Sequence, residues 1–201
     1  MNKMKMGMIS ILLSIVGSLL FGQNQHTDID DYLKKTMDLV DVPGMSVAVI
    51  KEGKVIFKAG YGVEVVEEDR AMTPDSVSAI GSVTKTFTAI AMMQLVERGL
   101  INLEDKVIDH LPWFRTLEKE KSDRISIEML LSNSSGLPTN APGFSWIVEE
   151  TGEFSALEMA RNLVSVKLLF EPGVSFNYSN SGFILLGLII EKLSGLDYSH
   201  F

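Results

Sequence analysis

Residues Ile80 to Pro112 read IGSVTKTFTAIAMMQLVERGLINLEDKVIDHLP, in which a serine and a lysine precede a long apolar stretch. Ser82 and Lys85 stand three residues apart at the expected start of a helix, so their side chains should lie on one face. The lysine nitrogen can then reach the serine hydroxyl and take its proton. This arrangement is typical of serine acyl-transfer enzymes whose base is lysine in place of histidine.

The S-x-x-K pattern is weak evidence when it stands alone. With 20 serines and 13 lysines in 201 residues, chance would give about 1.3 occurrences. The pattern occurs once in this chain, so the surrounding sequence has to decide its meaning.

A second motif supplies this context in Glu171 to Gly182, which reads EPGVSFNYSNSG. The Y-x-N pattern within it is rarer, with about 0.16 occurrences expected by chance. Tyr178 follows a Pro-Gly turn and precedes an apolar run of helical length, so we expect it on a loop between rigid flanks. Because a phenol near a lysine cation loses its proton more easily, Tyr178 is a candidate base or proton relay.

Three stretches, in this order, resemble the serine β-lactamase-related hydrolases, a group with class C β-lactamases, D-Ala-D-Ala carboxypeptidases and related esterases. They are Ile80 to Pro112, then ISIEMLLSNSSGLP from Ile125 to Pro138, then FNYSNSGFILLGLIIEKLSG from Phe176 to Gly195. The likeness begins at about Pro43 and runs to the last residue.

The resemblance implies a role for each residue of the two motifs. Ser82 would be the nucleophile, Lys85 its partner, Tyr178 the base, and Asn180 a polar contact to Lys85 or to the substrate. It also implies an α+β fold of the β-lactamase/transpeptidase type, in which a helical lobe packs on an antiparallel sheet. The substrate would be a small molecule or peptide with an amide or ester carbonyl: a β-lactam, a D-Ala-D-Ala peptide or a simple ester. No metal or other cofactor is implied.

Two departures from the family pattern affect what the resemblance can predict. Where many members read His-Thr-Ser-Gly, this chain has Asn133-Ser134-Ser135-Gly136, so no role of that histidine is carried over. The late Lys-Thr-Gly or His-x-Gly motif is absent, and only 21 residues follow Asn180. We therefore expect residues 23–201 to be the N-terminal portion of the hydrolase domain, with the C-terminal sheet strands missing. The alternative function is a catalytically inactive relic or binding module of the same fold.

Composition and the N-terminus indicate an exported globular protein. The chain is 46% hydrophobic and 22% charged, which is typical of folded domains. Residues 1–22 carry two lysines and no acid around an apolar stretch, which predicts a secretory signal peptide and a periplasmic or secreted location. Membrane association is expected only if this segment stays uncleaved. The net charge of −8 argues against a nucleic-acid partner, and without cysteines there are no disulfides or thiolate metal sites.

The first part of the chain should form a helix and a small sheet. Periodic apolar residues predict a helix from Asp28 to a Pro-Gly pair. Two β-rich runs, Met45 to Ile50 and Val55 to Ala59, flank Lys51-Glu52-Gly53-Lys54, which is a hairpin signal. Tyr61 to Val66 is a candidate third strand.

The later part is predicted to be helical and rich in loops. The helix that contains Lys85 has apolar residues on nearly every side, which predicts burial, and Gly99 marks its end. Ser155 to Glu158 form a capping-box pattern before a short helix to about Val166. Pro138 to Trp146 read as a long loop of the kind that borders clefts.

The singled-out residues also have simpler interpretations. Tyr178 could be a core tyrosine whose hydroxyl is satisfied, and Asn180 could act only as a helix cap. His26, His110 and His200 have no metal-ligand spacing, and we interpret them as solvated or structural.

Overall fold

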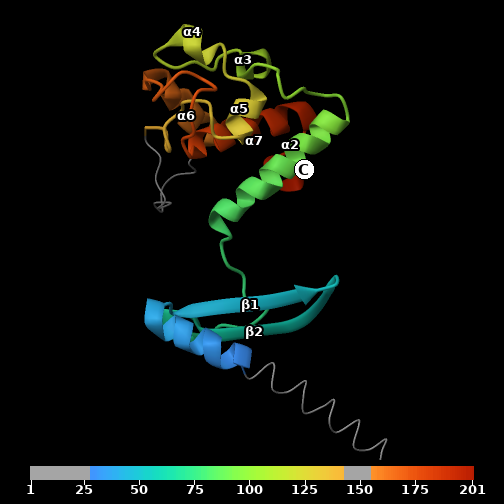
Figure 1. Cartoon of the computed structure of the whole chain (residues 1–201), viewed down its shortest axis with the longest axis vertical. Coiled ribbons are helices and arrows are strands. Elements are labelled where there is room, and N and C mark those ends of the chain that lie inside the picture. The colour runs from blue at the N-terminus through green and yellow to red at the C-terminus, as the bar shows by residue number, and fades with distance from the viewer. Residues whose placement is uncertain (1–27, 143–154) are drawn as a thin grey trace, which may run out of the picture. The chain divides into compact units, whose positions relative to one another are not determined.

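The computed structural model describes residues 28–142 and 155–201, which fall into two compact units, Met1–Ala79 and Ile80–Phe201 (Figure 1). The predicted signal peptide and residues 143–146 of the Pro138 to Trp146 loop lie outside the described residues. Among the helices in the described ranges, none has the length and apolarity to cross a membrane.

The first unit contains a three-stranded antiparallel sheet. Strands β1 (Gly44–Lys51) and β2 (Lys54–Val65) form the predicted hairpin, and β3 (Arg70–Ala71) pairs with β2, giving the order β1-β2-β3. The two turn residues, Glu52 and Gly53, both have positive φ angles, as the tightest hairpin turns require.

The predicted third strand, Tyr61 to Val66, is wrong as a separate element, because β2 continues through Val65. Glycines stand on either side of Tyr61. In the structure they mark close backbone contacts, since a Cβ atom at Gly60 would lie 2.4 Å from the carbonyl oxygen of Met72. Glycine inside a strand is often found where another part of the backbone approaches this closely.

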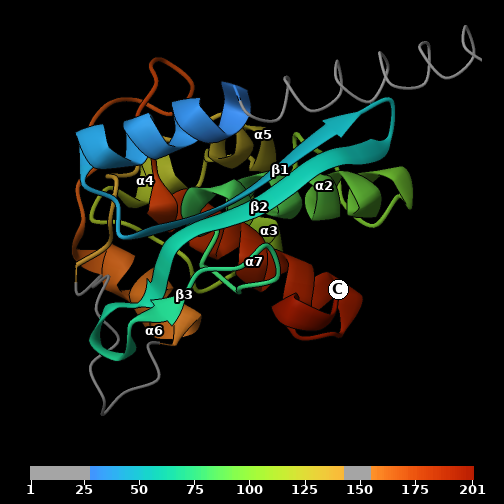
Figure 2. The ribbon, with the colours of Figure 1, turned by 90° about the horizontal axis from the view of Figure 1, so that it is seen from below.

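A helix through residues 28–40 runs along the hairpin (blue in Figure 2). The Tyr61 hydroxyl of β2 donates a hydrogen bond to Asp30 of this helix. Burial and the neighbouring Asp30 carboxylate raise the pKa of Tyr61 to about 12. In the described part of this unit no residue is fully buried, as expected when a hairpin and one helix are too small to enclose a core.

The second unit is helical and is built around α7 (Asn180–Ser194). Helices α2 (Thr84–Glu97), α5 (Ile127–Leu131) and α6 (Ala156–Arg161) contact α7, as Figure 1 shows. The fully buried side chains of α7 are Leu185, Leu186, Ile189 and Ile190. With an antiparallel sheet first and helices afterwards, the predicted α+β layout is confirmed.

Short elements connect these helices. They are η1 (Val66–Glu68) in the first unit and, in the second, η2 (Gly81–Val83), α3 (Val107–His110), α4 (Lys119–Ser122), η3 (Asn162–Ser165) and η4 (Tyr198–His200). Ser155 stands at the N-cap position of α6, but its side chain makes no cap hydrogen bond, so the expected capping box does not form. Together α6 and η3 reach Ser165, close to the predicted end of this helix.

Helix α2 follows the single 3-10 turn η2 and ends as predicted, with Gly99 in a left-handed conformation (φ 69°). Its buried residues are Thr88, Met92 and Leu95. Three large apolar side chains on it remain about half exposed: Phe87 (59%), Ile90 (53%) and Met93 (47%). Within the second unit α7 covers one side of this helix, and its burial on the remaining sides stays a prediction.

Candidate active site

Ser82 and Lys85 lie one helical turn apart, where η2 passes into α2. Lys85 Nζ donates a hydrogen bond to Ser82 Oγ at 3.3 Å. The Ser82 side chain is exposed and Lys85 is half-buried, so the hydroxyl faces solvent while the ammonium group lies below it. The predicted shared face is present, and it follows directly from the helical spacing.

Tyr178 reaches the same hydroxyl from a distant part of the chain. Its Oη donates a hydrogen bond to Ser82 Oγ at 2.7 Å, and Lys85 Nζ lies 4.7 Å from the centre of its ring. The Tyr178 side chain is 38% exposed, which contradicts the alternative of a core tyrosine. The Lys85 ammonium lowers the pKa of the Tyr178 phenol, and the Ser82 hydroxyl lowers it further, because both groups stabilise the phenolate.

Asn180 completes the group as the first residue of α7. Its Oδ1 accepts a hydrogen bond from Lys85 Nζ at 2.6 Å, and its Nδ2 donates to Asn140 Oδ1 at 2.7 Å. The cap of α7 is Ser179, whose Oγ accepts from the Gly182 backbone N–H at 3.1 Å. The alternative that Asn180 serves only as a helix cap is therefore wrong.

Asn140 is a fifth polar residue at the site, and it was not among the predicted site residues. This side chain accepts the amide protons of Asn180 and so leaves Oδ1 of Asn180 directed at Lys85. Asn140 lies 40 residues before Asn180 in the chain. The one available signal was a polar residue shortly after the Leu-Pro pair of the second family landmark, which is too common a pattern to assign a role.

A row of acceptors on residues 133–139 holds the loop that carries Tyr178. Three backbone carbonyl oxygens of this segment accept hydrogen bonds from it. The Leu137 carbonyl accepts from Asn177 Nδ2 at 2.9 Å, and the Pro138 carbonyl accepts from Ser179 Oγ at 2.8 Å. The Thr139 carbonyl accepts from the Asn180 backbone N–H at 2.7 Å. Each bond has ordinary hydrogen-bond geometry, and together they fix the path of the chain into α7.

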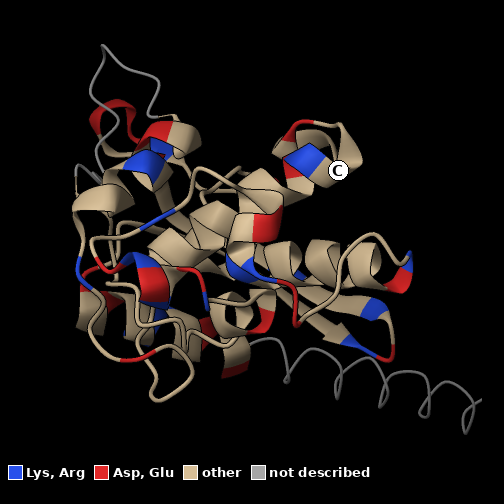
Figure 3. Ribbon diagram, turned by 90° about the horizontal axis from the view of Figure 1, so that it is seen from above, with Lys and Arg blue, Asp and Glu red and all other residues tan. Residues whose placement is uncertain are grey.

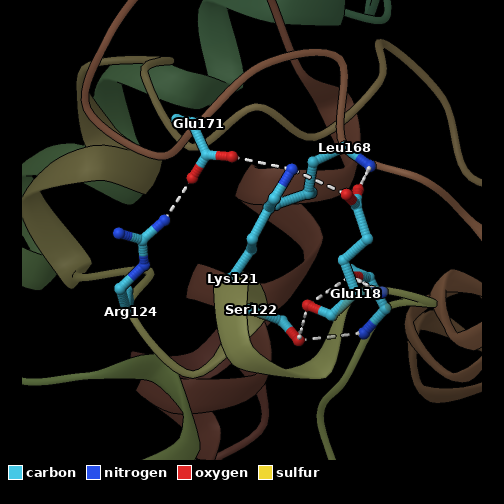
Figure 4. A network of polar contacts seen from close by, with 7 residues as sticks. Glu118, Lys121, Ser122, Arg124, Leu168 and Glu171 are labelled. Carbon is cyan, nitrogen blue, oxygen red and sulfur yellow. Dashed lines mark hydrogen bonds and ion pairs between the residues drawn. The ribbon is translucent and has the colours of Figure 1, made fainter.

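A charged network holds the segment before this loop (Figure 4). Lys121 Nζ lies 2.6 Å from a Glu118 carboxylate oxygen and 2.7 Å from one of Glu171, and Arg124 also pairs with Glu171. Glu118 accepts the backbone N–H of Leu168 at 3.0 Å. Lys121 lowers the pKa of both carboxyl groups. The network joins α4 to the residues that lead into the Tyr178 loop.

Three of the four predicted residues, Ser82, Lys85 and Asn180, border a shallow pocket of about 240 Å³, and the Tyr178 hydroxyl reaches it through its hydrogen bond to Ser82 Oγ. Its lining combines the polar groups of Ser82, Lys85 and Asn180 with apolar side chains of α7, including Phe183, whose ring centre is 5.4 Å from Lys85 Nζ. A nucleophile, a cation and a phenol thus converge on one opening, which suits attack on a polarised carbonyl group.

The described residues contain no group of three or more His, Cys, Asp or Glu side chains that could hold a metal ion. The His110 ring lies 3.2 Å from the Asp105 carboxylate, a contact that fits its interpretation as a structural residue.

Comparison with known proteins supports the family resemblance. The family model described as Beta-lactamase matches residues 29–201. Protein flp of Staphylococcus aureus (strain COL) is 30% identical over 178 residues, which cover 89% of this chain and 35% of that protein. Penicillin-binding protein 4* of Bacillus subtilis (strain 168) is 30% identical over 164 residues, covering 78% of this chain and 34% of that protein.

Among solved structures, an octameric penicillin-binding protein homologue from Pyrococcus abyssi is similar, with a TM-score of 0.68 and 33% identity. The match covers 87% of this chain and 40% of that one. The chain spans about a third of the length of the curated relatives it matches, and its fold is part of the β-lactamase/transpeptidase-like fold. Since the family model matches most of its residues, the chain belongs to the Beta-lactamase family.

Proposed function

We propose that this site forms an acyl-enzyme on Ser82 from a substrate with an amide or ester carbonyl. The observation that carries the proposal is the 2.7 Å hydrogen bond between Tyr178 Oη and Ser82 Oγ beside the Lys85 ammonium. A serine hydroxyl is a weak nucleophile and needs a neighbouring base. Because Lys85 lowers the pKa of Tyr178, we assign the Tyr178 phenolate as that base.

The reaction then proceeds in two stages. Ser82 Oγ bonds to the carbonyl carbon while its proton passes to Tyr178 Oη. When the tetrahedral adduct collapses, the bond to the leaving nitrogen or oxygen breaks and the leaving group takes up that proton. Water then gives a proton to the same phenolate as its oxygen bonds to the carbonyl carbon. The bond to Ser82 Oγ breaks, the proton passes from Tyr178 Oη to Ser82 Oγ, and the acid is released.

Lys85 and Asn180 hold the charge of this system in place. The Lys85 ammonium lies beside the phenol and donates to both Ser82 Oγ and Asn180 Oδ1. Asn180 thus fixes the cation beside Tyr178, where it stabilises the phenolate that acts as the base.

The surroundings of the site favour a small molecule or a peptide over a nucleic acid as the substrate. The chain carries a net charge of −8, and Figure 3 shows acidic and basic residues interspersed along the ribbon. A phosphate backbone binds to concentrated positive charge. We further propose export to the periplasm or the medium on the basis of residues 1–22, which N-terminal sequencing of the mature chain would test.

The test of the proposed function is covalent labelling of the whole chain by a fluorophosphonate and by a fluorescent penicillin, read by intact-mass spectrometry. We expect Ser82→Ala to abolish labelling. Lys85→Ala should cost nearly as much, because groups that act as a unit are strongly non-additive. Penicillin adducts would place the substrate among β-lactams and related amides, while labelling by the phosphonate alone would favour esters.

Ser165→Ala is the matched control. Within residues 28–142 and 155–201 its hydroxyl bonds only to the Asn162 carbonyl, so the variant should label as the unmodified chain does. Undiminished labelling of Ser82→Ala would disprove the nucleophile assignment. A folded chain that takes up neither reagent would favour the alternative, an inactive relic or binding module.

A further inference from the structure

Asn133 contacts the chain on both sides of Tyr178. Its backbone carbonyl oxygen accepts the N–H of Asn177 at 2.9 Å, and its Oδ1 accepts the N–H of Ser179 at 2.9 Å. The two residues that flank Tyr178 are thus bonded to one residue, which lies 46 positions before Ser179 in the chain.

The backbone of Asn133 is suited to this double contact. It has a φ angle of 56°, in the left-handed region, directly after α5, and its N–H donates to the Leu130 carbonyl at 3.2 Å. Asparagine adopts this conformation more readily than most residues with a side chain. Since α5 contacts the central helix α7, the two acceptors of Asn133 are presented from a fixed position.

The Tyr178 ring is only partly enclosed by its surroundings. Its side chain is 38% exposed, so the place of Oη depends on the backbone at either side. Displacement of a reacting group by about 1 Å can cost about 100-fold in rate, and the bond from Oη to Ser82 Oγ is 2.7 Å long.

We infer that Asn133 is a positioning residue that holds the Tyr178 phenol against Ser82 and Lys85. The catalytic consequence rests on the proposed function, whereas the placement of the phenol can be measured without it. The other acceptors for this loop, on Leu137, Pro138 and Thr139, are backbone carbonyls. A substitution of Asn133 therefore removes one side-chain contact and leaves these acceptors in place.

The decisive variant is Asn133→Gly, which keeps the carbonyl and tolerates positive φ but lacks Oδ1. The pKa of Tyr178 is read by ultraviolet titration of tyrosine in the whole chain, as the difference from the same chain with Tyr178→Phe. Of the charged groups on the described residues, Lys85 acts on this phenol. We expect the lowered pKa of Tyr178 to rise towards its ordinary value in Asn133→Gly, because the phenol moves away from Lys85 and Ser82.

Labelling of Ser82 should become about 10- to 100-fold slower in the same variant, with part of the loss recovered at higher pH. Ser126→Ala is the structural control, since it removes the side-chain cap of α5 and, in the described residues, Ser126 makes no hydrogen bond to the Tyr178 loop. It should lower the melting temperature to a similar extent and leave the pKa of Tyr178 unchanged.

Asn133→His tests rescue. The Nδ1 atom of a neutral histidine occupies the place of Oδ1 and can accept a hydrogen bond, and histidine also tolerates positive φ. This variant should keep the pKa of Tyr178 low. If Asn133→Gly does not fold, Asn133→Ser, whose side chain is one atom shorter, takes its place.

An unchanged pKa of Tyr178 in folded Asn133→Gly would overturn the inference. So would an equal rise in Ser126→Ala, or a pKa in folded Asn133→His as high as in the glycine variant. If the unmodified chain is not labelled at all, the proposed function fails, and the titration still decides whether Asn133 positions the phenol.

Discussion

Ser82 and Lys85 are brought together by one turn of helix, whereas Tyr178 and Asn180 reach them from a loop about 95 residues further along the chain. The first pair depends on local backbone geometry, which any stable helix start supplies. The second pair depends on hydrogen bonds from residues 133–140 and, for its approach, on the charged network around Lys121. The two halves of the site should therefore fail in different ways.

The second half is the more vulnerable to remote changes. Each hydrogen bond that holds Tyr178 and Asn180 contributes only about 0.5–1.5 kcal/mol net to folding stability, but each also fixes the orientation of the group that it holds. Losing one would leave the chain folded and the phenol misplaced. Helix α2, in contrast, is anchored by buried Met92 and Leu95 on its side towards α7, so Ser82 and Lys85 should stay paired as long as the helix survives.

The largest effect of a change in the second pair, Tyr178 and Asn180, is expected for Tyr178→Phe. The variant keeps the ring and removes the hydroxyl, so turnover of an activated ester should fall by about 100-fold or more. The melting temperature should hardly change, because the side chain is 38% exposed. Ester hydrolysis and a thermal melt measure the two quantities on one preparation.

Tyr198→Phe is the matched control for this prediction. The Tyr198 hydroxyl lies 2.6 Å from Thr88 Oγ1 on buried α2 surface, so its loss should lower the melting temperature and leave turnover per folded molecule nearly intact. If Tyr178→Phe behaved in this way, Tyr178 would be a structural tyrosine and the assignment of the base would fail.

A smaller effect, on stability first, is expected for Gly136→Ala in the segment that supports Tyr178. Gly136 has a φ angle of 80°, and a Cβ atom there would lie 2.4 Å from the Phe170 carbonyl oxygen. Gly99 at the end of α2 has a φ angle of 69° and open space around it. Gly99→Ala should therefore cost about 1–2 kcal/mol for its left-handed backbone alone, and Gly136→Ala about 3 kcal/mol or more.

Denaturant unfolding compares the two glycine variants, and phosphonate labelling shows the consequence for the site. Labelling should slow in Gly136→Ala, since residues 133–140 have to shift, and should persist in Gly99→Ala. Equal losses of unfolding free energy in Gly136→Ala and Gly99→Ala would mean that the Phe170 carbonyl moves easily to make room for the added Cβ atom. The segment that supports Tyr178 would then be less rigid than its hydrogen bonds indicate.

What the sequence predicted follows the same division. The S-x-x-K spacing, the Gly99 helix end and the Lys51 to Lys54 hairpin depend on residues close together in the chain, and all three are present. The contacts of Asn133 and Asn140 join segments 46 and 40 residues apart. No local pattern encodes such a pairing, and asparagine is common in loops, so neither side chain could be singled out.

The alternatives and predictions that the sequence could not decide have comparable causes. Ser179 and Asn180 are adjacent and both favour N-cap positions, so the sequence could not tell which one caps α7. Apolar residues on nearly every side of α2 predicted burial, but burial is decided by the neighbours that a helix acquires. In the second unit these cover the side with Leu95 and leave Phe87 and Ile90 exposed.

The smallest expected effect concerns the charged network before the Tyr178 loop. Lys121, and after it Arg124, lower the pKa of the Glu171 carboxyl in the folded chain. A lowered folded pKa contributes stability that is present above the ordinary glutamate pKa and is lost as the pH falls through the folded value. Glu171→Gln should therefore melt slightly lower near neutral pH, and its curve should converge with that of the unmodified chain in acid.

The difference should be small because the paired side chains are partly exposed, with 46% for Glu171 and 32% for Lys121, and exposed ion pairs contribute little. Glu120→Gln on the same helix is the control, since the described residues show no ion pair for Glu120. If melting temperatures of the Glu171 variant ran parallel to those of the unmodified chain down to acid pH, the network would not contribute to the acid dependence. The Tyr178 loop would then be held by the hydrogen bonds from residues 133–140 alone.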